Sequence, residues 1–193
     1  MKKDDIIQSA KKLFTTYGYK KVSMDEIALN AGVTKKTIYS YFKDKNDLFN
    51  YFVLEELKNM KNIIEKNDKL DKPYFKKIHQ TIYELIKYKK ENQFLGRISK
   101  DAEVLNNMQA KESIKMFDDA IIKYIKEKIE IAIEQKKIKT CDSDIAAFVI
   151  YKVYAALMYD WSSENKELDE KEFSDNITKI LKDGIFIKQS QAS

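Results

Sequence analysis

The sequence predicts an all-α protein, and three observations support that fold class. The chain of 193 residues contains only four glycines and one proline, whereas sheet proteins with many hairpins need more of both. Apolar residues recur at helical spacing in most segments, and residues that commonly cap helices precede several of them. We expect about nine helices, divided between a three-helix amino-terminal domain, residues 1–47, and a larger helical domain, residues 48–193.

An apolar stripe that ends in a glycine predicts the first helix. Its members follow the spacing i, i+4, i+7, i+8 and i+11: Ile6, Ala10, Leu13, Phe14 and Tyr17. Gly18 stands where a helix C-terminus needs a left-handed residue. Ser23 and Glu26 then have the spacing of a capping box, which predicts the start of a second helix.

The stretch VTKKTIYSYF, residues 33–42, predicts a short third helix with two unlike faces. Thr34 is placed to cap it, and Ile38 and Phe42 share one face at i and i+4. The opposite face carries cations and a hydroxyl: Lys36, Ser40 and Lys43. Two short helices separated by a glycine-containing turn match the helix-turn-helix signature. The alternative is a surface helix with a solvated lysine face.

The charge of the chain is concentrated near its beginning. The net charge is +5, and residues 1–50 hold ten lysines against six carboxylates, a balance of +4. The remaining 143 residues therefore carry a balance of only +1. An excess of lysine in the segment with the helix-turn-helix signature indicates a module that binds phosphates.

The rest of the chain is predicted to form longer helices joined by polar loops. Five are expected, over about residues 45–67, 73–90, 110–136, 144–161 and 169–188. Asp44 is placed to cap the first of these, the pair Asp169 and Glu172 the last, and Pro73 favours a helix start. The stripe after that proline is Phe75, Ile78, Ile82 and Ile86. Residues 94–105 are expected to be less regular.

Helix 144–161 is apolar nearly all round, so it needs cover on both sides. Neighbouring helices can cover one side, and a second copy of the chain can cover the other. We therefore expect a symmetric homodimer; the alternative is a central helix in a monomeric bundle. The expected interface residues are Phe148, Val149, Val153, Ala156, Trp161, Ile177, Ile180 and Leu181.

The composition indicates a globular protein of the cytoplasm. Hydrophobic residues make up 44% of the chain and charged residues 35%, which is typical of a well-solvated surface. Cys141 is the one cysteine and cannot form an internal disulfide, which fits a reducing compartment. The charged amino-terminal stretch is unlike a signal peptide, and no run approaches the ~18 apolar residues of a membrane span.

The first fifty residues resemble the TetR family of bacterial transcriptional regulators. The pattern consists of Leu13-Phe14, Gly18-Tyr19, Ser23-Met24, Ile27-Ala28, Ala31-Gly32-Val33 and TIYSYFKDKNDLF, residues 37–49. The portion that joins the third helix to a long fourth helix is quite specific. The remainder of the chain agrees with the family in length, helix count and dimer-like terminal helices.

The resemblance implies a dimer in which each third helix enters the major groove of a palindromic operator. The residues at positions that touch bases or backbone in the family are Met24, Thr34, Lys35, Lys36, Thr37, Tyr39, Ser40, Tyr41 and Lys45. Of these, Tyr39 and Lys45 match positions that usually contact phosphate. Asp25 departs from the expected hydroxyl or cation and receives no role.

The resemblance also implies that residues from about 50 onward bind a small-molecule effector of unknown identity. Candidate pocket residues are His79, Tyr83, Phe94, Met108, Phe117, Tyr124, Tyr151, Tyr154 and Met158, although residue type and spacing favour a structural role over a ligand contact for each of them. Asp118, Asp119 and Asp160 would favour a cationic effector if they lined that pocket, but helix carboxylates are usually solvated or paired. No cofactor or metal is expected.

Two other functions compete with that of a ligand-responsive repressor. An enzyme finds no support, since the sequence lacks catalytic and phosphate-loop motifs and places Cys141 far from His79. A DNA-binding protein of the architectural or nucleoid type, without an effector, keeps the helix-turn-helix but needs no pocket. An open pocket would favour the regulator and a solidly filled core the architectural protein.

Overall fold

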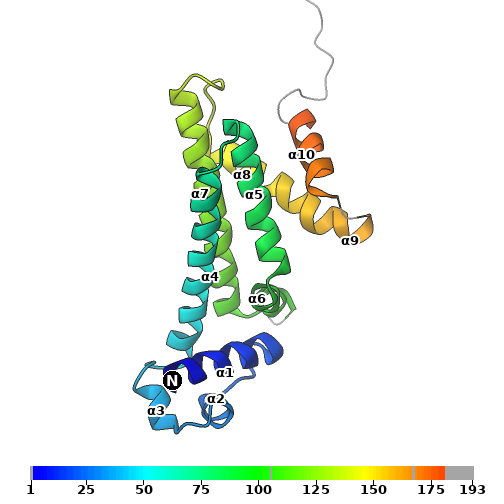
Figure 1. Cartoon of the computed structure of the whole chain (residues 1–193). Coiled ribbons are helices and arrows are strands. Elements are labelled where there is room, and N and C mark those ends of the chain that lie inside the picture. The colour runs from blue at the N-terminus through cyan, green and yellow to red at the C-terminus, as the bar shows by residue number, and fades with distance from the viewer. Residues whose placement is uncertain (1, 105, 167, 181–193) are drawn as a thin grey trace, which may run out of the picture.

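The computed structural model describes residues 2–104, 106–166 and 168–180, and every regular element in these ranges is helical (Figure 1). The first three helices are α1 (Lys2–Tyr17), α2 (Met24–Asn30) and α3 (Lys35–Tyr39). The others are α4 (Lys45–Asp68), α5 (Tyr74–Glu91), α6 (Gln93–Val104), α7 (Met108–Glu134), α8 (Ser143–Ala156), the π-helix η1 (Leu157–Trp161), α9 (Ser162–Glu164) and α10 (Glu170–Thr178). Because α8, η1 and α9 follow one another without a break, the described residues form nine separate helical segments. The all-α prediction is confirmed.

Local signals set the helix ends of the amino-terminal domain, as the sequence predicted. Gly18 has φ +84° just after α1. Ser23 and Glu26 form a complete capping box at the start of α2, and the Thr34 side chain accepts a hydrogen bond from the backbone N–H of Thr37 at the start of α3. We refer to α1–α3 as the head and to α4–α10 as the body.

The head and the body share one hydrophobic core. α4 begins beside the head and runs up into the body, while α1 lies across the foot of the upright helices (Figure 1). Phe14 of α1 contacts Phe49 and Phe52 of α4, with ring centroids 5.5 and 6.1 Å apart. Phe94 of α6 lies 5.7 and 5.8 Å from the same two rings. Aromatic packing of this kind resists separation of the two parts.

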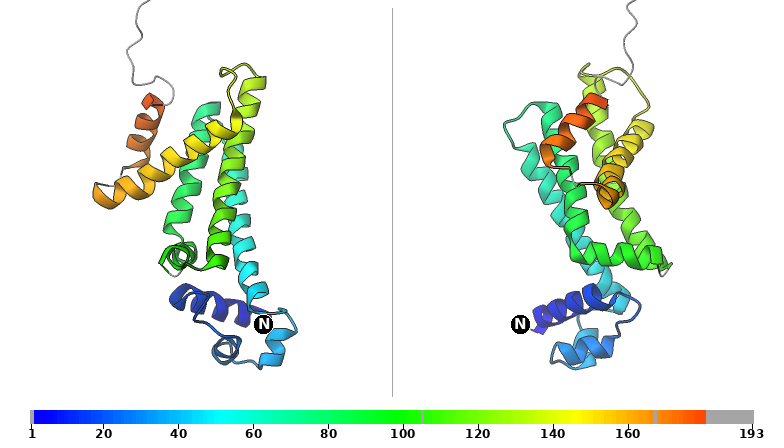
Figure 2. Two further views of the ribbon diagram at one scale, coloured as in Figure 1. Left: turned by 180° about the vertical axis from the view of Figure 1, so that it is seen from behind. Right: turned by 90° about the vertical axis from the view of Figure 1, so that its right-hand side faces the viewer.

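The body consists of the upright helices α4, α5 and α7, with α6 crossing their lower end next to α1 (Figures 1 and 2). α8 slants across α7 and leads to α10, which stands to one side of the bundle (Figure 2). α10 is fastened by the buried side chains Phe173 and Ile177. None of the helices in the described ranges is both long enough and apolar enough to cross a lipid bilayer.

Three features of the body differ from the sequence predictions. Residues 94–105 were expected to be irregular, but Gln93–Val104 forms α6. Phe75 was placed on an apolar stripe, yet its side chain is 53% exposed. The predicted helix 144–161 changes from α to π geometry at Leu157. The predicted extension of the last helix to Lys188 lies outside the described residues.

We predict that Gly18→Ala destabilises the protein more than Gly32→Ala. Both glycines have positive φ, +84° and +63°, so alanine is strained at either position by about 1–2 kcal/mol. A Cβ atom at residue 18 would lie 2.3 Å from Oδ2 of Asp101 and 2.7 Å from Nη2 of Arg97, whereas nothing lies within 4 Å at residue 32. Gly18→Ala should therefore cost about 1–3 kcal/mol more in the free energy of unfolding in urea. Equal losses would contradict the close approach of α6.

Candidate DNA interface and effector site

Helix α3 is fixed from its apolar side, as predicted. Ile38 is fully buried and Phe42 is 5% exposed, whereas Lys36, Ser40 and Lys43 are exposed. Hydroxyls brace the same short helix: Thr34 and Thr37 lie 2.8 Å apart through their Oγ1 atoms, and Ser40 Oγ donates to the Thr37 carbonyl at 2.7 Å. The polar face of α3 is thus free to meet a ligand while the helix stays in place.

Most of the predicted DNA-contacting side chains lie on this accessible surface at the end of the molecule farthest from α10 (Figure 1). The exposed ones are Thr34, Lys35, Lys36, Tyr39, Ser40 and Tyr41, and Thr37 is half-buried. Tyr39 and Tyr41 each expose 46% of their surface. Phenol and ammonium groups on a helix of this size match the donors that contact phosphates and base edges in a major groove.

Asp25, which the sequence left without a role, holds one of these lysines. Its Oδ2 atom lies 2.9 Å from the Lys35 ammonium, and both side chains are largely exposed. The hydrogen bond that Lys35 donates to Asp25, followed by the charge of that carboxylate, raises the pKa of Lys35. An exposed ion pair of this kind is weak, so a phosphate or a guanine edge can compete for the ammonium while the carboxylate aims it.

Two residues predicted to contact DNA, Met24 and Lys45, do not lie on this exposed surface of α3. Met24 requires a correction: its side chain is 7% exposed and belongs to the core, because it lies on the same inward face of α2 as Ile27 and Ala28. Lys45 donates to the carbonyls of Tyr19 at 3.0 Å and Val22 at 2.9 Å, and its ammonium lies 4.5 Å from the Tyr19 ring. Burial lowers the pKa of Lys45. This lysine therefore ties the turn between α1 and α2 to the start of α4.

The predicted effector-pocket residues are mostly buried, and they lie in different parts of the body. Tyr83, Phe94, Phe117, Tyr124, Tyr151, Tyr154 and Met158 are buried, and His79 is half-buried. Met108 is a correction: it begins α7 with its side chain 65% exposed. Phe94 belongs to the junction with the head, where it packs against the two phenylalanines of α4.

Three of these residues meet in one aromatic cluster beneath α10. His79 Nδ1 lies 2.5 Å from the Tyr154 hydroxyl, and the His79 and Tyr83 rings are 6.4 Å apart. Phe173 of α10, which the sequence did not single out, closes the cluster at 5.1 Å from Tyr83 and 5.3 Å from Tyr154. Burial lowers the pKa of His79, and its Nε2 atom is buried without a hydrogen-bond partner among the described residues.

Asp118, considered for a cationic effector, already has a cationic partner. Its Oδ1 atom lies 2.5 Å from the ammonium of Lys89, which is 9% exposed, and 2.6 Å from the Tyr151 hydroxyl. Burial, together with the Asp118 carboxylate, raises the pKa of Tyr151. The half-buried carboxylate is therefore already paired from within the bundle.

The hollows that stand out on the described surface lie away from these clusters. One is lined by the charged side chains of α7 from Asp119 to Glu130 and by Asp144. The other lies on the head between α1 and α2, next to Leu13 and Leu29. Neither is lined by any of the nine predicted pocket residues.

An apolar strip on α8 and η1 is exposed in the part of the chain that the structure describes. Ile145, Phe148, Val149 and Trp161 are 64%, 51%, 47% and 46% exposed. Ala156 is exposed, Val153 is half-buried, and Ile180 after α10 is 46% exposed. Ile177 is a correction, since it is 4% exposed and packs into its own chain; Leu181 lies outside the described residues. Within the described residues, this helix is therefore not covered on all sides.

Known proteins share both the sequence and the fold. The profile of the tetR family of bacterial regulatory proteins matches residues 6–52. The uncharacterized HTH-type transcriptional regulator YhgD of Bacillus subtilis (strain 168) is 34% identical over 166 residues, which cover 86% of this chain and 87% of that protein. IcaR of Staphylococcus aureus (strain Newman), a negative transcriptional regulator of the biofilm operon icaADBC, is 28% identical over 138 residues, 65% of this chain and 74% of IcaR.

A solved structure extends the likeness of fold over the body. The regulator FadR of Bacillus subtilis in complex with stearoyl-CoA superposes with a TM-score of 0.70 at 20% sequence identity, covering 95% of this chain and 100% of FadR. The head geometry, the family profile over that head and the relative that spans most of the chain agree. The chain belongs to the tetR family of bacterial regulatory proteins and is a DNA-binding transcriptional regulator of the helix-turn-helix type.

Proposed function

We propose that this chain is a ligand-responsive repressor that binds a palindromic operator as a homodimer. The observation that carries the proposal is the placement of two unpartnered surfaces at opposite ends of the molecule. The polar face of α3 lies at the foot of the head, and the apolar strip of α8 and η1 lies high on the body (Figure 1). Two copies joined through that strip leave both heads free for DNA.

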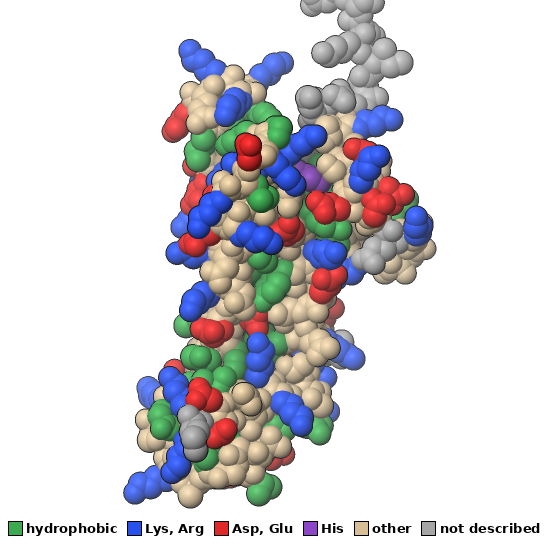
Figure 3. All heavy atoms as spheres, viewed as in Figure 1, with side chains coloured by type: hydrophobic (Ala, Val, Ile, Leu, Met, Phe, Trp, Pro, Cys, Tyr) green, Lys and Arg blue, Asp and Glu red, His purple; other side chains and the backbone are tan. Residues whose placement is uncertain are grey.

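The exposed residues of α3 supply the groups that would contact the bases and phosphates of the operator. A lysine binds the O6 and N7 acceptors of guanine, and a tyrosine hydroxyl binds phosphate. Lys36 and Lys35 stand in the first turn of the helix, where the free N–H groups already favour anions. Lysines and carboxylates are interspersed over the face of the body seen in Figure 3, so that face offers no comparable patch of one sign.

Negative regulation is supported by a relative. IcaR, 28% identical over 138 residues, is described as a negative regulator of its operon. A dimer that occupies a palindrome blocks polymerase without any further contact surface. We therefore place repression ahead of activation for this chain.

An effector response is supported by a protein of the same fold. FadR of Bacillus subtilis holds stearoyl-CoA, which joins a long apolar acyl chain to a charged nucleotide. In this chain, a ligand of that class would have to part the aromatic cluster of His79, Tyr83, Tyr154 and Phe173. It would release DNA only to the extent that it binds the opened state better than the closed one.

A second candidate function is favoured by one observation, the burial of most of the candidate pocket residues. A helix-turn-helix protein of the architectural type would keep these residues buried permanently. Acyl-CoA compounds of increasing chain length, titrated into the protein–operator complex with free coenzyme A as control, separate the two functions. Release by the long acyl chains supports the regulator, and no release by any compound supports the architectural protein.

We predict that replacing both Lys35 and Lys36 by alanine weakens operator binding strongly. Each good base contact is worth roughly 1–3 kcal/mol, so the double variant should lose several kcal/mol of binding free energy at fixed salt. Its affinity should also depend less on salt, by about 0.9 in log–log slope for each phosphate that the variant no longer neutralises. Fluorescence anisotropy of a labelled operator measures both quantities.

The matched control for that experiment removes two exposed lysines from the body. Lys58 and Lys61 lie on the outer side of α4, and their replacement by alanine takes the same charge from the chain. Affinity should then change little. A loss as large as that of the α3 double variant would show a general charge effect and remove α3 from the interface.

We predict that Phe148→Asp converts the dimer into a monomer. A carboxylate in the centre of the apolar strip would be buried without a partner when two copies join, which is strongly unfavourable. Light scattering at micromolar concentration should report half the wild-type mass, with helical circular dichroism unchanged. Phe75→Asp is the control, because Phe75 is as exposed as Phe148, 53% against 51%, but lies on α5. A wild type that is already monomeric would contradict the proposed assembly.

A further inference from the structure

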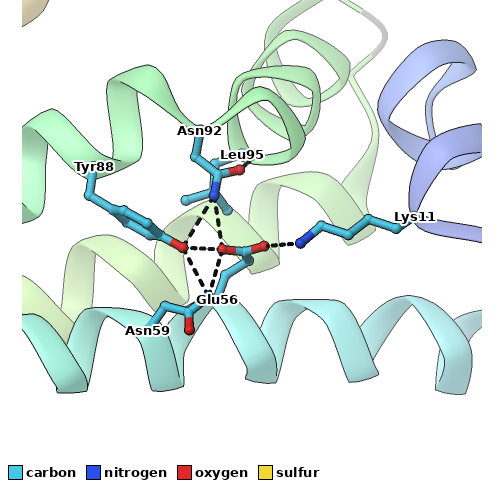
Figure 4. Close-up of polar contacts among 6 residues, drawn as sticks. All are labelled: Lys11, Glu56, Asn59, Tyr88, Asn92 and Leu95. Carbon is cyan, nitrogen blue, oxygen red and sulfur yellow. Dashed lines mark hydrogen bonds and ion pairs between the residues drawn. The ribbon is translucent and has the colours of Figure 1, made fainter. Parts of the chain in front are cut away.

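A buried carboxylate on α4 joins the head to the body. Glu56 is 1% exposed and accepts hydrogen bonds from three other segments (Figure 4). The Lys11 ammonium of α1 lies 2.8 Å from Oε1, and Asn92 Nδ2, between α5 and α6, lies 2.9 Å from Oε2. The Tyr88 hydroxyl of α5 donates to the same Oε2 atom. One side chain thus holds α1, α5 and the start of α6 together.

The partners of Glu56 keep it charged although it is buried. Burial acts to raise the pKa of Glu56, but hydrogen bonds from Lys11 and Tyr88 and the charge of Lys11 outweigh it, so the pKa lies below its ordinary value. A buried charge is tolerated only when it is fully paired, and loss of one partner is costly. The paired carboxylate therefore favours one arrangement of α1, α4, α5 and the start of α6 over others.

Asn92, one of the partners of Glu56, also sets the first turn of α6. Asn92 donates to Glu56 through Nδ2 and accepts from the backbone N–H of Leu95 through Oδ1, at 3.0 Å (Figure 4). A shift of α1 relative to α4 would disturb Glu56, and through Asn92 it would disturb α6. The head is thus linked to α6 by one chain of hydrogen bonds.

Further along α6, a second set of polar contacts returns to the head. Arg97 is the one arginine of the chain, and its Nη2 atom donates to the Tyr17 carbonyl at 2.8 Å. Its Nε atom lies 3.1 Å from Asp101, whose Oδ2 accepts from the Tyr19 backbone N–H at 3.2 Å. Gly18 lies between these contacts with no room for a side chain. A guanidinium serves a carbonyl and a carboxylate at once, which a lysine does less well.

We propose that Glu56, Arg97 and Asp101 are positioning residues that determine which half-site spacing the dimer accepts. The aromatic junction holds the head against the body, but a single polar attachment beside it would still permit the head to rotate slightly. Two polar attachments oppose such rotation: Lys11 is held by Glu56 of α4, and residues 17–19 are held by Arg97 and Asp101 of α6. Each head then points its α3 in a direction set by the body. This inference rests on the proposed dimeric function.

The test uses full-length protein and a palindrome first selected from random DNA with the wild type. Duplexes carry the same half-sites at the selected spacing, or with one or two base pairs inserted or removed, and one duplex carries a single half-site. Each added base pair turns one half-site by about 34° relative to the other, because B-DNA has about 10.5 base pairs per turn. The wild type should lose at least about tenfold in affinity per step, since protein or DNA must twist.

The variants Glu56→Gln and Arg97→Lys each weaken one attachment. Their affinity ratio between the selected and the shifted spacing should fall to a few-fold, while binding to the single half-site stays at the wild-type level. Arg97→Lys keeps the charge and is the milder change, should Glu56→Gln fail to fold. Asp118→Asn is the matched control: it removes a carboxylate paired with a lysine and a tyrosine, but wholly within the body. It should keep the wild-type spacing preference.

The outcomes separate this inference from the dimeric function. Variants that retain the full spacing preference, or lose affinity equally for all duplexes, overturn the positioning role and leave the dimer intact. If Asp118→Asn also lost its preference for the selected spacing, the cause would be a general loss of rigidity. That result would likewise overturn the positioning role. A wild type that binds one half-site as tightly as two would overturn the dimeric proposal and this inference with it.

Discussion

The structure depends on the packing of α1 between α4 and α6. Phe14 is the centre of that contact, with the rings of Phe49 and Phe52 on α4 and that of Phe94 behind them. The three helices of the head bury too little apolar surface to be stable alone, since domains of this size are marginal. They gain a core by sharing the one in the body. The consequence is mechanical, because a head that shares a core cannot tumble freely.

The polar contacts around this apolar junction set the orientation of the head on the body. Hydrophobic contact alone is tolerant of rotation, whereas hydrogen bonds at Glu56 and around Gly18 are satisfied in only one arrangement. Lys45 adds a third tie by closing the turn that leads into α2. The exposed surface of α3 is therefore presented in a defined direction relative to α8, where the second copy is proposed to bind.

Helix ends that depend on residues close together in the sequence could be predicted correctly. Gly18, the capping box at Ser23 and Glu26, and the cap at Thr34 act over three or four residues, so the pattern is enough to identify them. The inward and outward faces of α3 followed from the same short-range periodicity. The family profile confirmed what these residues had suggested about DNA binding.

Features that depend on contacts across the fold could not be predicted in the same way. Met24 was expected to contact DNA from its position in the family pattern, yet the packing of the head buries it. Lys45 looked like a phosphate ligand, but two carbonyls from a distant turn receive its ammonium. Glu56 did leave a signal that was overlooked: it follows Phe52 by four residues, so a carboxylate stood on the apolar stripe of α4.

Two copies that hold rigidly mounted heads at a fixed separation should show one distance between those heads. The most direct measurement is a distance between spin labels on Leu29→Cys in a Cys141→Ser background, because Leu29 is 85% exposed on α2 and away from the polar face of α3. Double electron–electron resonance should give one narrow peak, of the order of the ~34–36 Å between successive major-groove half-sites or somewhat longer. Absence of dipolar coupling, or a distribution spread over tens of ångströms, would contradict a dimer with fixed heads.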